Sequence, residues 1–199
     1  MTRSVTGRTR WTRFAAVLAP AVLAGAALVV STAEGALAAS FAVSGQNFKV
    51  SAATLEAEGF AQFGSVDTGA GGARHPVAPA GIRSAKLTDL CQSVLVPTPF
   101  GDLTLRITAG GSRPVTATNL VLDADQLGGD ATFTNIELGR DASTLDRVPG
   151  HTGPRGRFGQ QAEKVSLRNL KVRAWGTTAG TFTLTDMAMD AKFGRDECF

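Results

Sequence analysis

Residues 115–138, VTATNLVLDADQLGGDATFTNIEL, decide the fold. Apolar and polar residues alternate along this stretch, as in a strand with one buried face, but the alternation changes phase at Asn119 and again at Asn135. Side chains of a strand point to its two faces in turn, so a change of phase predicts a β-bulge, with one inserted residue that bends the strand. Between the two halves, Gly128-Gly129-Asp130 is typical of a turn. The stretch therefore predicts a hairpin with two kinked arms.

The same change of phase recurs at other Asn and Asp residues. Each lies between apolar residues in a pattern such as Leu-Thr-Asp-Leu, and the positions are Asp89, Asn119, Asn135, Asn169 and Asp186, with Asn47 as a weaker sixth. Residues 165–189 copy residues 115–138 almost position for position. We therefore predict an internal repeat of kinked hairpins, in which the Asn and Asp side chains hydrogen bond to locally disrupted backbone. Calcium binding is the weaker interpretation, because one carboxylate per arm makes a poor cage.

The remaining segments fit the same architecture. Alternating or apolar runs predict strands over residues 41–53, 60–66, 82–96, 100–109, 164–174 and 180–193. Gly and Pro predict loops over residues 67–81 and 140–162, and a loop as long as the second is usually a lid, a binding loop or a disordered stretch. A short segment at residues 54–58 is the only helix candidate after the N-terminal region.

These elements predict an all-β domain. Kinked hairpins in series give a curled, mainly antiparallel sheet, which forms a barrel, a sandwich or a half-pipe. The inner face of such a sheet either packs as a plain core or leaves an apolar channel that suits a lipid.

The N-terminus has the three parts of a secretory signal peptide. Four arginines precede an uncharged apolar run over residues 14–30, and Ala36-Leu37-Ala38 offers a small-x-small cleavage site. We predict a signal helix within residues 1–38 and one secreted β domain over residues 39–199, located outside the cell or in the extracytoplasmic cell envelope. A retained membrane anchor is the alternative, because the apolar run is at the short end of a membrane span.

Removal of the signal segment changes the charge balance. The whole chain has 20 Lys and Arg against 17 Asp and Glu, and residues 1–38 hold four of the former and one of the latter, which leaves 16 of each. A neutral secreted domain does not favour nucleic-acid binding. Its two cysteines, Cys91 and Cys198, are predicted to form a disulfide in an oxidising compartment.

Catalytic candidates are few and weak. Only His75 and His151 could serve as a base at neutral pH. Ser93 and Asp89 could join His75 in a Ser–His–acid arrangement, but four residues apart on one strand they lie roughly 13 Å apart. The sequence has no nucleophile elbow, no paired metal-binding histidines and no phosphate-binding glycine loop before a helix, so neither a metal nor a cofactor is predicted.

Several long strings resemble one protein family. They are FAVSGQNFKVSA (residues 41–52), SAKLTDLCQSV (84–94), VTATNLVLDADQLGGDATFTNIELG (115–139), FGQQAEKVSL (158–167) and the terminal ECF. They are similar to an exported actinobacterial (Streptomyces-type) family of unknown function, whose members are commonly named cholesterol esterase. The resemblance implies a secreted hydrolase of steryl esters, and it brings no catalytic motif that could be carried over to this chain.

Two functional hypotheses follow. The first is a secreted cholesterol (steryl) esterase that hydrolyses long-chain carboxylic esters and takes a hydrophobic lipid or steryl ester as its partner. The second is a non-catalytic lipid-binding or cell-envelope β-protein, for which self-association through sheet edges into a homo-oligomer is a further expectation.

Overall fold

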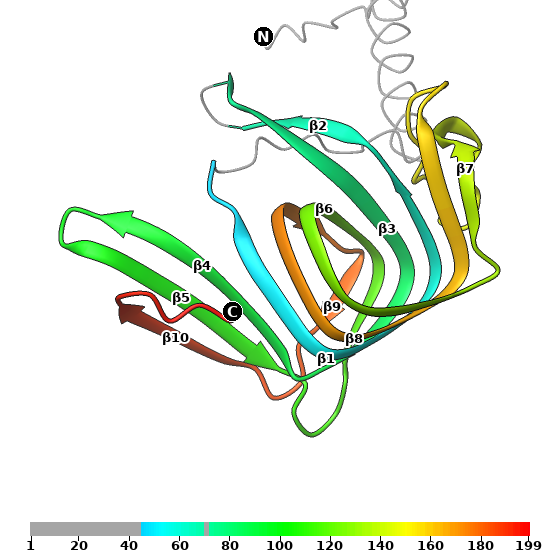
Figure 1. Ribbon diagram of the computed structural model, residues 1–199. Helices are drawn as coiled ribbons and strands as arrows, with labels where there is room; N and C mark the ends of the chain where they lie inside the picture. Colours follow the sequence, from blue (N-terminus) through cyan, green and yellow to red (C-terminus); the bar gives the residue numbers. More distant parts are fainter. Residues whose placement is uncertain (1–44, 70–71) are drawn as a thin grey trace, which may run out of the picture. The chain divides into compact units, whose positions relative to one another are not determined.

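The fold consists of four long, antiparallel β arms (Figure 1). The computed structural model describes residues 45–69 and 72–199, so the predicted signal helix lies outside the described residues. Arm 1 contains β1 (Phe48–Phe63) and β2 (Ser65–Thr68), and arm 2 contains β3 (Arg74–Thr88) and β4 (Leu90–Thr98). Arm 3 contains β5 (Gly101–Ala109), β6 (Val115–Thr134) and β7 (Glu137–Asp141). Arm 4 contains β8 (Phe158–Thr178), β9 (Thr181–Thr183) and β10 (Ala188–Phe193), and a 3-10 helix, η2 (Ala142–Thr144), follows β7.

The strands form one ten-stranded antiparallel sheet, with the principal order β10-β5-β4-β1-β3-β6-β8-β7. The sheet curls so far that β1 also pairs with β8, from Phe48 opposite Ala174 to Phe63 opposite Gly159. The pairings of β1, β3, β6 and β8 therefore form a closed circuit. Strands β4, β5 and β10, which we call the wing, splay away from this curl (Figure 1). The predicted all-β, curled, antiparallel architecture is confirmed, although the wing makes it neither a regular barrel nor a sandwich.

The repeated Asn and Asp residues bend the arms. Five residues other than glycine have positive φ, between 47° and 55°: Asp89, Asn119, Asn135, Asn169 and Asp186. Asn and Asp adopt this left-handed conformation more readily than other residues with a side chain, because they are short and can hydrogen bond locally. Asn47 is not among them, and Gly45, with φ 79°, has the positive φ in that segment.

These residues lie in rows across the sheet. Asn119 lies opposite Arg83, which lies opposite Gly59 (φ 68°), because the pairs on both sides of these positions keep one register. Asn169 lies in the same way opposite Ala53 on β1. Between β1 and β3, β3 and β6, and β1 and β8 the register does not shift, so no residue is inserted there and the β-bulge predicted at Asn119 is absent. Between β6 and β8 it does shift, where Asn169 and Leu170 both lie opposite Gly129, as the predicted β-bulge requires.

At each Asn or Asp with positive φ, and at Gly59, the strand bends, and we call these positions corners. Side chains that point inward have odd numbers on one side of a corner and even numbers on the other.

The predicted hairpin turn at Gly128–Asp130 is also wrong, because β6 runs straight through it. Gly129 has φ 142°, and a Cβ added there would lie 2.8 Å from the carbonyl oxygen of Arg168. The glycine is therefore needed for close approach to β8 rather than for a reversal of the chain. The predicted last hairpin fails in the same way, since β8 and β9 both pair with β6 and continue in one direction.

Two further predictions are corrected in arms 1 and 2. Residues 74–81, predicted as loop, belong to β3. Pro76 pairs only with β2 and Pro79 only with β6, so each proline has a neighbouring strand on one side only. Its missing N–H can face the other side, where no hydrogen bond to a strand is required. Residues 54–58, the helix candidate, lie in β1, where apolar residues are buried and Glu56 and Glu58 are exposed in strict alternation. That period of two outweighs helix propensity.

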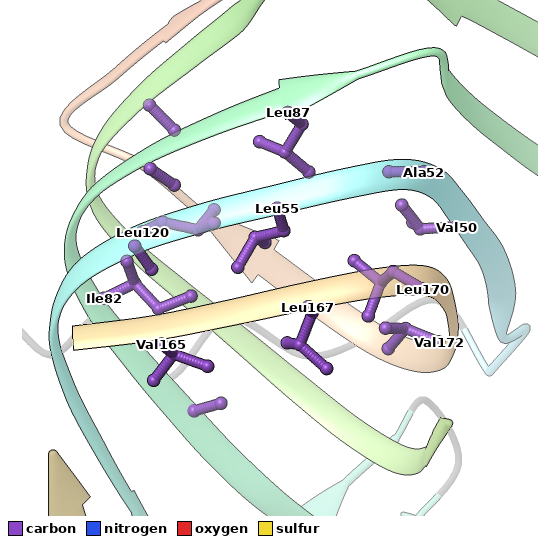
Figure 2. Close-up of a cluster of buried hydrophobic side chains, with 14 of the residues drawn as sticks. Val50, Ala52, Leu55, Ile82, Leu87, Leu120, Val165, Leu167, Leu170 and Val172 are labelled. Carbon is purple, nitrogen blue, oxygen red and sulfur yellow. The ribbon is translucent and has the colours of Figure 1, made fainter. Parts of the chain in front are cut away.

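The core lies inside the curl, where side chains from β1, β3, β6 and β8 point toward one another (Figure 2). The buried positions on β1 are Val50, Ala52, Leu55, Ala57 and Phe60, so their spacing alternates between two and three. Each spacing of three spans a row of corners. The change of phase in the sequence thus keeps one continuous apolar surface on the inside of a strand that bends. No helix among the described residues is long and apolar enough to cross a membrane.

Candidate functional site: an apolar cavity and its surroundings

The inside of the curl contains an apolar cavity of about 140 Å³. Its lining comes from six strands and includes Phe48, Leu55, Phe60, Ile82, Leu87, Leu120, Leu127, Phe133, Val165, Leu167, Val172 and Phe182. Its polar lining residues are Gln62, Gln92, Gln160 and Thr177, and none of the lining residues is ionisable. Gln160 donates to Gln62 Oε1 (2.6 Å), and Thr177 donates to the carbonyl oxygen of Val121 (3.1 Å). The cavity is therefore a hydrocarbon-like compartment, and three of its four polar side chains are hydrogen-bonded to other protein groups.

The volume limits what the cavity can hold. Small-molecule sites usually measure about 300–1,000 Å³, whereas an apolar cavity of about 150 Å³ stays dry and accepts a molecule the size of benzene. A whole sterol is too large for the cavity as it stands. A narrow hydrocarbon segment fits both its size and its lining.

The apolar surface continues from the cavity onto the wing. Phe48, which lines the cavity, pairs with Val94 on β4, and Val94 lies opposite Leu105 on β5, which lies opposite Ala191 on β10. Residues on this side of the three strands share one face, which we call the wing face: Val94, Val96, Leu103, Leu105, Ile107, Met189, Ala191 and Phe193. None of the eight is buried, and Met189 and Phe193 are 65% and 72% exposed.

The opposite face of the wing is covered by the C-terminal tail. Cys91 and Cys198 form a disulfide with an S–S distance of 2.04 Å, as the sequence predicted. Thr104 Oγ1 donates to the carbonyl oxygen of Gly194 (2.6 Å), and Cys198 N donates to Ser93 Oγ (3.0 Å). The tail thus lies across β4 and β5 and leaves the wing face open among the described residues.

The Ser–His–acid arrangement is not assembled. Ser93 is buried beneath the tail, where its hydroxyl oxygen accepts the bond from Cys198 N. Asp89 is exposed at a corner of arm 2, and His75 is at the other end of that arm, opposite Asp67. No hydrogen bond between described residues joins Ser93, Asp89 and either histidine.

His75 belongs instead to a small aromatic and acidic cluster. Its ring stacks on Trp175 with centroids 3.6 Å apart, and Trp175 donates to Asp125, which also receives a bidentate pair from Arg173. Burial alone would raise the pKa of Asp125, but the hydrogen bonds from Arg173 and Trp175 hold it below its usual value. His75 Nε2 and Asp67 Oδ2 are buried without a described partner, and a Cβ added at Gly69 would lie 2.9 Å from His75 Nε2.

Burial also raises the pKa of neighbouring carboxyl groups. It raises the pKa of Asp123 to about 6, and the nearby charge of Asp67 adds to the effect. The pKa of Asp67 is raised by its own burial, which His75 partly offsets. Asp67 lies opposite His75 on β3, and Asp123, within β6, lies opposite Pro79; neither lines the cavity. Among the described residues, no group of three His, Cys, Asp or Glu could hold a metal ion.

The loop after β7, residues 142–157, is not a lid on the cavity. Leu145 and Val148 pack with Ala61 in a second apolar cluster, on the face of β1 that points away from the cavity. His151 is buried in this loop, its Nε2 lies 3.2 Å from the carbonyl oxygen of Pro79, and burial lowers its pKa. His151 therefore fastens the loop to β3, and the lid interpretation of residues 140–162 is wrong.

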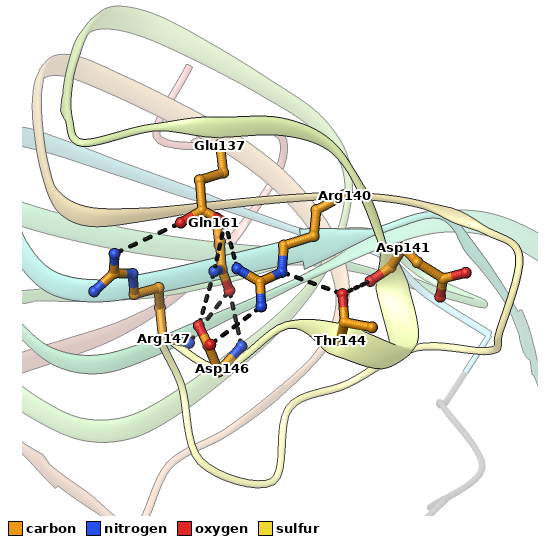
Figure 3. Close-up of polar contacts among 7 residues, drawn as sticks. All are labelled: Glu137, Arg140, Asp141, Thr144, Asp146, Arg147 and Gln161. Atoms are coloured by element: carbon orange, nitrogen blue, oxygen red, sulfur yellow. Dashed lines mark hydrogen bonds and ion pairs between the residues drawn. The ribbon is translucent and has the colours of Figure 1, made fainter.

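A polar network fixes the same loop (Figure 3). Gln161, fully buried on β8, accepts hydrogen bonds from the backbone N–H groups of Asp146 and Arg147 and donates to the Glu137 and Asp146 carboxylates. The pKa of Glu137 is lowered first by its hydrogen bond from Arg140, and that of Asp146 by its bond from Gln161. The network holds charges on the outer surface and has no link to the cavity. The sequence analysis did not predict a role for Gln161. The only sign of it in the sequence is a polar residue within a regular apolar strand.

The model of a family of unknown function (DUF6230) matches residues 44–199. The chain belongs to the DUF6230 family. No curated protein and no solved structure matches this DUF6230 chain. Its function must therefore be inferred from the cavity, the wing face and the residues around them.

Proposed function

We propose that this chain binds one hydrocarbon chain of a lipid inside the curl of its sheet and catalyses no reaction on it. The observation that carries the proposal is the cavity of about 140 Å³, whose lining is almost wholly apolar and contains no ionisable residue. Filling such a cavity removes hydrocarbon from water and restores the dispersion contacts that an empty space lacks.

The wing face supports the same proposal. It begins where Phe48 pairs with Val94, so an apolar chain that enters the cavity has a continuous apolar surface on which its remaining length can lie. A contiguous exposed apolar surface of this kind marks an interaction site. The extracytoplasmic location expected from the N-terminal sequence would place the protein beside cell-envelope lipids.

Chain length gives a first test. Burial of one methylene contributes about 0.8 kcal/mol, so the affinity for saturated fatty acids should rise about fourfold per added carbon until the cavity is full. Beyond that length it should rise less per carbon, because the wing face covers only one side of the chain. Competition with a fluorescent fatty acid measures this series. Affinities that do not depend on chain length would contradict burial of the hydrocarbon.

A matched pair of substitutions localises the binding. Val165 lines the cavity, whereas its neighbour Lys164 is exposed on the other face of β8. Val165→Phe fills the cavity and should lower fatty-acid affinity at least tenfold, while Lys164→Phe should leave it unchanged. Equal affinities in both variants would place the binding elsewhere.

Hydrolysis of steryl esters is the second candidate, favoured by the resemblance of the sequence to exported actinobacterial proteins commonly named cholesterol esterase. The cavity lining offers no Ser, Cys, His or carboxylate as nucleophile or base, so we expect no turnover of cholesteryl or other long-chain esters. Turnover by the purified chain that is lost in His75→Ala, His151→Ala or Ser93→Ala would establish the enzyme. Turnover that survives in all three would remove these residues from its mechanism.

A further inference from the structure

We propose that the wing is a dimerisation surface, on which β10 pairs antiparallel with β10 of a second copy of this chain. Strand β10 pairs with β5 on one side and is the last strand of the sheet on the other. All six of its residues are exposed. An edge strand of this kind presents a row of main-chain N–H and C=O groups that another strand can pair with.

The two faces of β10 differ in character. Met189, Ala191 and Phe193 belong to the wing face, while Asp190 and Lys192 point to the face that carries the C-terminal tail. Lys192 Nζ lies 3.6 Å from Asp196, and its side chain remains 60% exposed. Asp190 takes part in none of the ion pairs between described residues. Asp190 is therefore available to a partner, and Lys192 can exchange its long contact with Asp196 for a partner's carboxylate.

Twofold symmetry leaves few possible registers. In this dimer the twofold axis is normal to the sheet that the two copies share. Residues that lie opposite each other in an antiparallel pair have their side chains on the same face, and successive residues of one strand alternate between the faces. The axis must therefore pass next to one residue, which then lies opposite its own copy, and not between two residues. An axis at Asp190 would place two Asp190 carboxylates opposite each other, and an axis at Lys192 would oppose two ammonium groups. Like charges directly opposite are destabilising.

An axis at Ala191 places favourable partners opposite each other on both faces of the strand. Asp190 then lies opposite Lys192 of the second copy, and Lys192 opposite Asp190, on the charged face. On the wing face, Met189 lies opposite Phe193 of the second copy, and the two Ala191 residues meet at the axis. Opposite charges and large apolar residues across a strand pair are both stabilising. This register therefore makes the edge of β10 complementary to itself.

A second copy suits the edge better than a hydrocarbon does. Lipid could cover the wing face, but it offers no hydrogen-bonding groups to the main chain of β10 and no partner to Asp190 or Lys192. Only another strand satisfies the edge and the charges together. The dimer does not depend on lipid binding in the cavity. If the chain proved to be a monomer, the lipid-binding proposal would be unaffected.

A charge exchange across the axis tests the register. The full chain should have the mass of a dimer by size-exclusion chromatography with light scattering at micromolar concentration. Asp190→Lys gives an all-basic edge and Lys192→Asp an all-acidic one, and each variant alone should lose the dimer, so that its mass falls by half. An equimolar mixture of the two variants should recover a heterodimer, because every charged pair across the axis is then opposite in sign.

Recovery on mixing separates loss of the interface from loss of folding, since misfolded chains would not be rescued by each other. Arg113→Asp, an exposed loop substitution with the same change of charge as Lys192→Asp, should stay dimeric. A monomeric wild type overturns the proposal, and wild-type monomers that float with lipid vesicles would assign the wing face to lipid instead. Dimers that persist in both single variants, or monomers that persist in the mixture, would overturn the proposed register.

Discussion

Left-handed Asn and Asp residues set the curvature of this sheet. At Asn119, with φ 47°, the backbone adopts a conformation that costs most residues about 1–2 kcal/mol, and that Gly adopts without strain. Asn is among the few residues with a side chain that adopt this conformation with little strain. The residue thus stabilises a bend that an ordinary strand would resist.

We predict that Asn119→Ala lowers the free energy of unfolding by about 1 kcal/mol, because alanine is strained at positive φ, which Asn tolerates better. Asn119→Gly should have a smaller effect, since glycine has no Cβ to clash. Urea denaturation measures both, and Thr118→Ala, at an exposed neighbour on the same strand, is the control. A glycine variant less stable than the alanine variant would show that the left-handed conformation is not what selects Asn.

Gly81 accommodates the buried ring of His151. A Cβ added at Gly81 would lie 2.5 Å from two carbons of that ring. We predict that Gly81→Ala destabilises the protein by about 1–3 kcal/mol through overpacking. In a His151→Ala background the same substitution should cost much less, and thermal unfolding of the four proteins completes this double-mutant cycle. Additive effects would mean that the two residues are not in contact.

Asp123 makes stability depend on pH. Its pKa is raised from 3.8 to about 6, so the folded state holds the proton over a range in which the unfolded chain has lost it. Stability is therefore lost as pH rises from about 4 to about 6, and the loss is complete above that range. We predict that Asp123→Asn melts at a higher temperature than wild type at pH 7 and that the difference disappears below pH 4. His151, with its lowered pKa, acts in the opposite direction below pH 6.5 and is common to both proteins. A difference that does not vary with pH would contradict the raised pKa.

At the scale of the element, the disulfide fastens the tail to the wing. Cys91 and Cys198 are 107 residues apart, and closure of a loop of that length contributes about 5 kcal/mol in the chain-entropy model. We predict that the Cys91→Ser, Cys198→Ser double variant loses up to that amount of stability. Its faster hydrogen exchange should be concentrated in β4, β5 and residues 194–199. Faster exchange spread evenly over the sheet would contradict the local role.

The sequence predicts the elements well where a local pattern has a single physical cause. The alternation of apolar residues and its change of phase at Asn119, Asn135 and Asn169 reflect the inner surface of the sheet directly. The hairpin turn predicted at Gly128–Asp130 was wrong because glycine occurs both in turns and where two strands approach closely. Only the position of the neighbouring arm shows which of these two roles the glycine has. The same ambiguity affected Pro76 and Pro79, whose free sides depend on which strand pairs where.

The candidate site could be predicted only in part. An apolar inner face follows from the period of the strands, but a remaining space of about 140 Å³ depends on how side chains from six strands meet. The two histidines attracted attention by their chemistry, yet both have structural surroundings: His75 stacks on Trp175, and His151 fixes a loop on the outer face. No local signal distinguishes a buried structural histidine from a catalytic one.

At the scale of the whole molecule, the closed circuit of β1, β3, β6 and β8 surrounds an apolar cavity, and the wing continues its surface outward. Corner residues produce the curl, the curl produces the cavity, and the cavity is the feature on which a lipid-binding function depends. The edge of β10 adds a surface for a second copy.

Native mass spectrometry of the chain purified from its own cell envelope or culture medium tests the central claim most directly. We predict one lipid-sized mass adduct per chain, retained in Lys164→Phe and lost in Val165→Phe. A wild-type chain without any adduct, or an adduct that persists when the cavity is filled by Val165→Phe, would contradict hydrocarbon binding inside the curl.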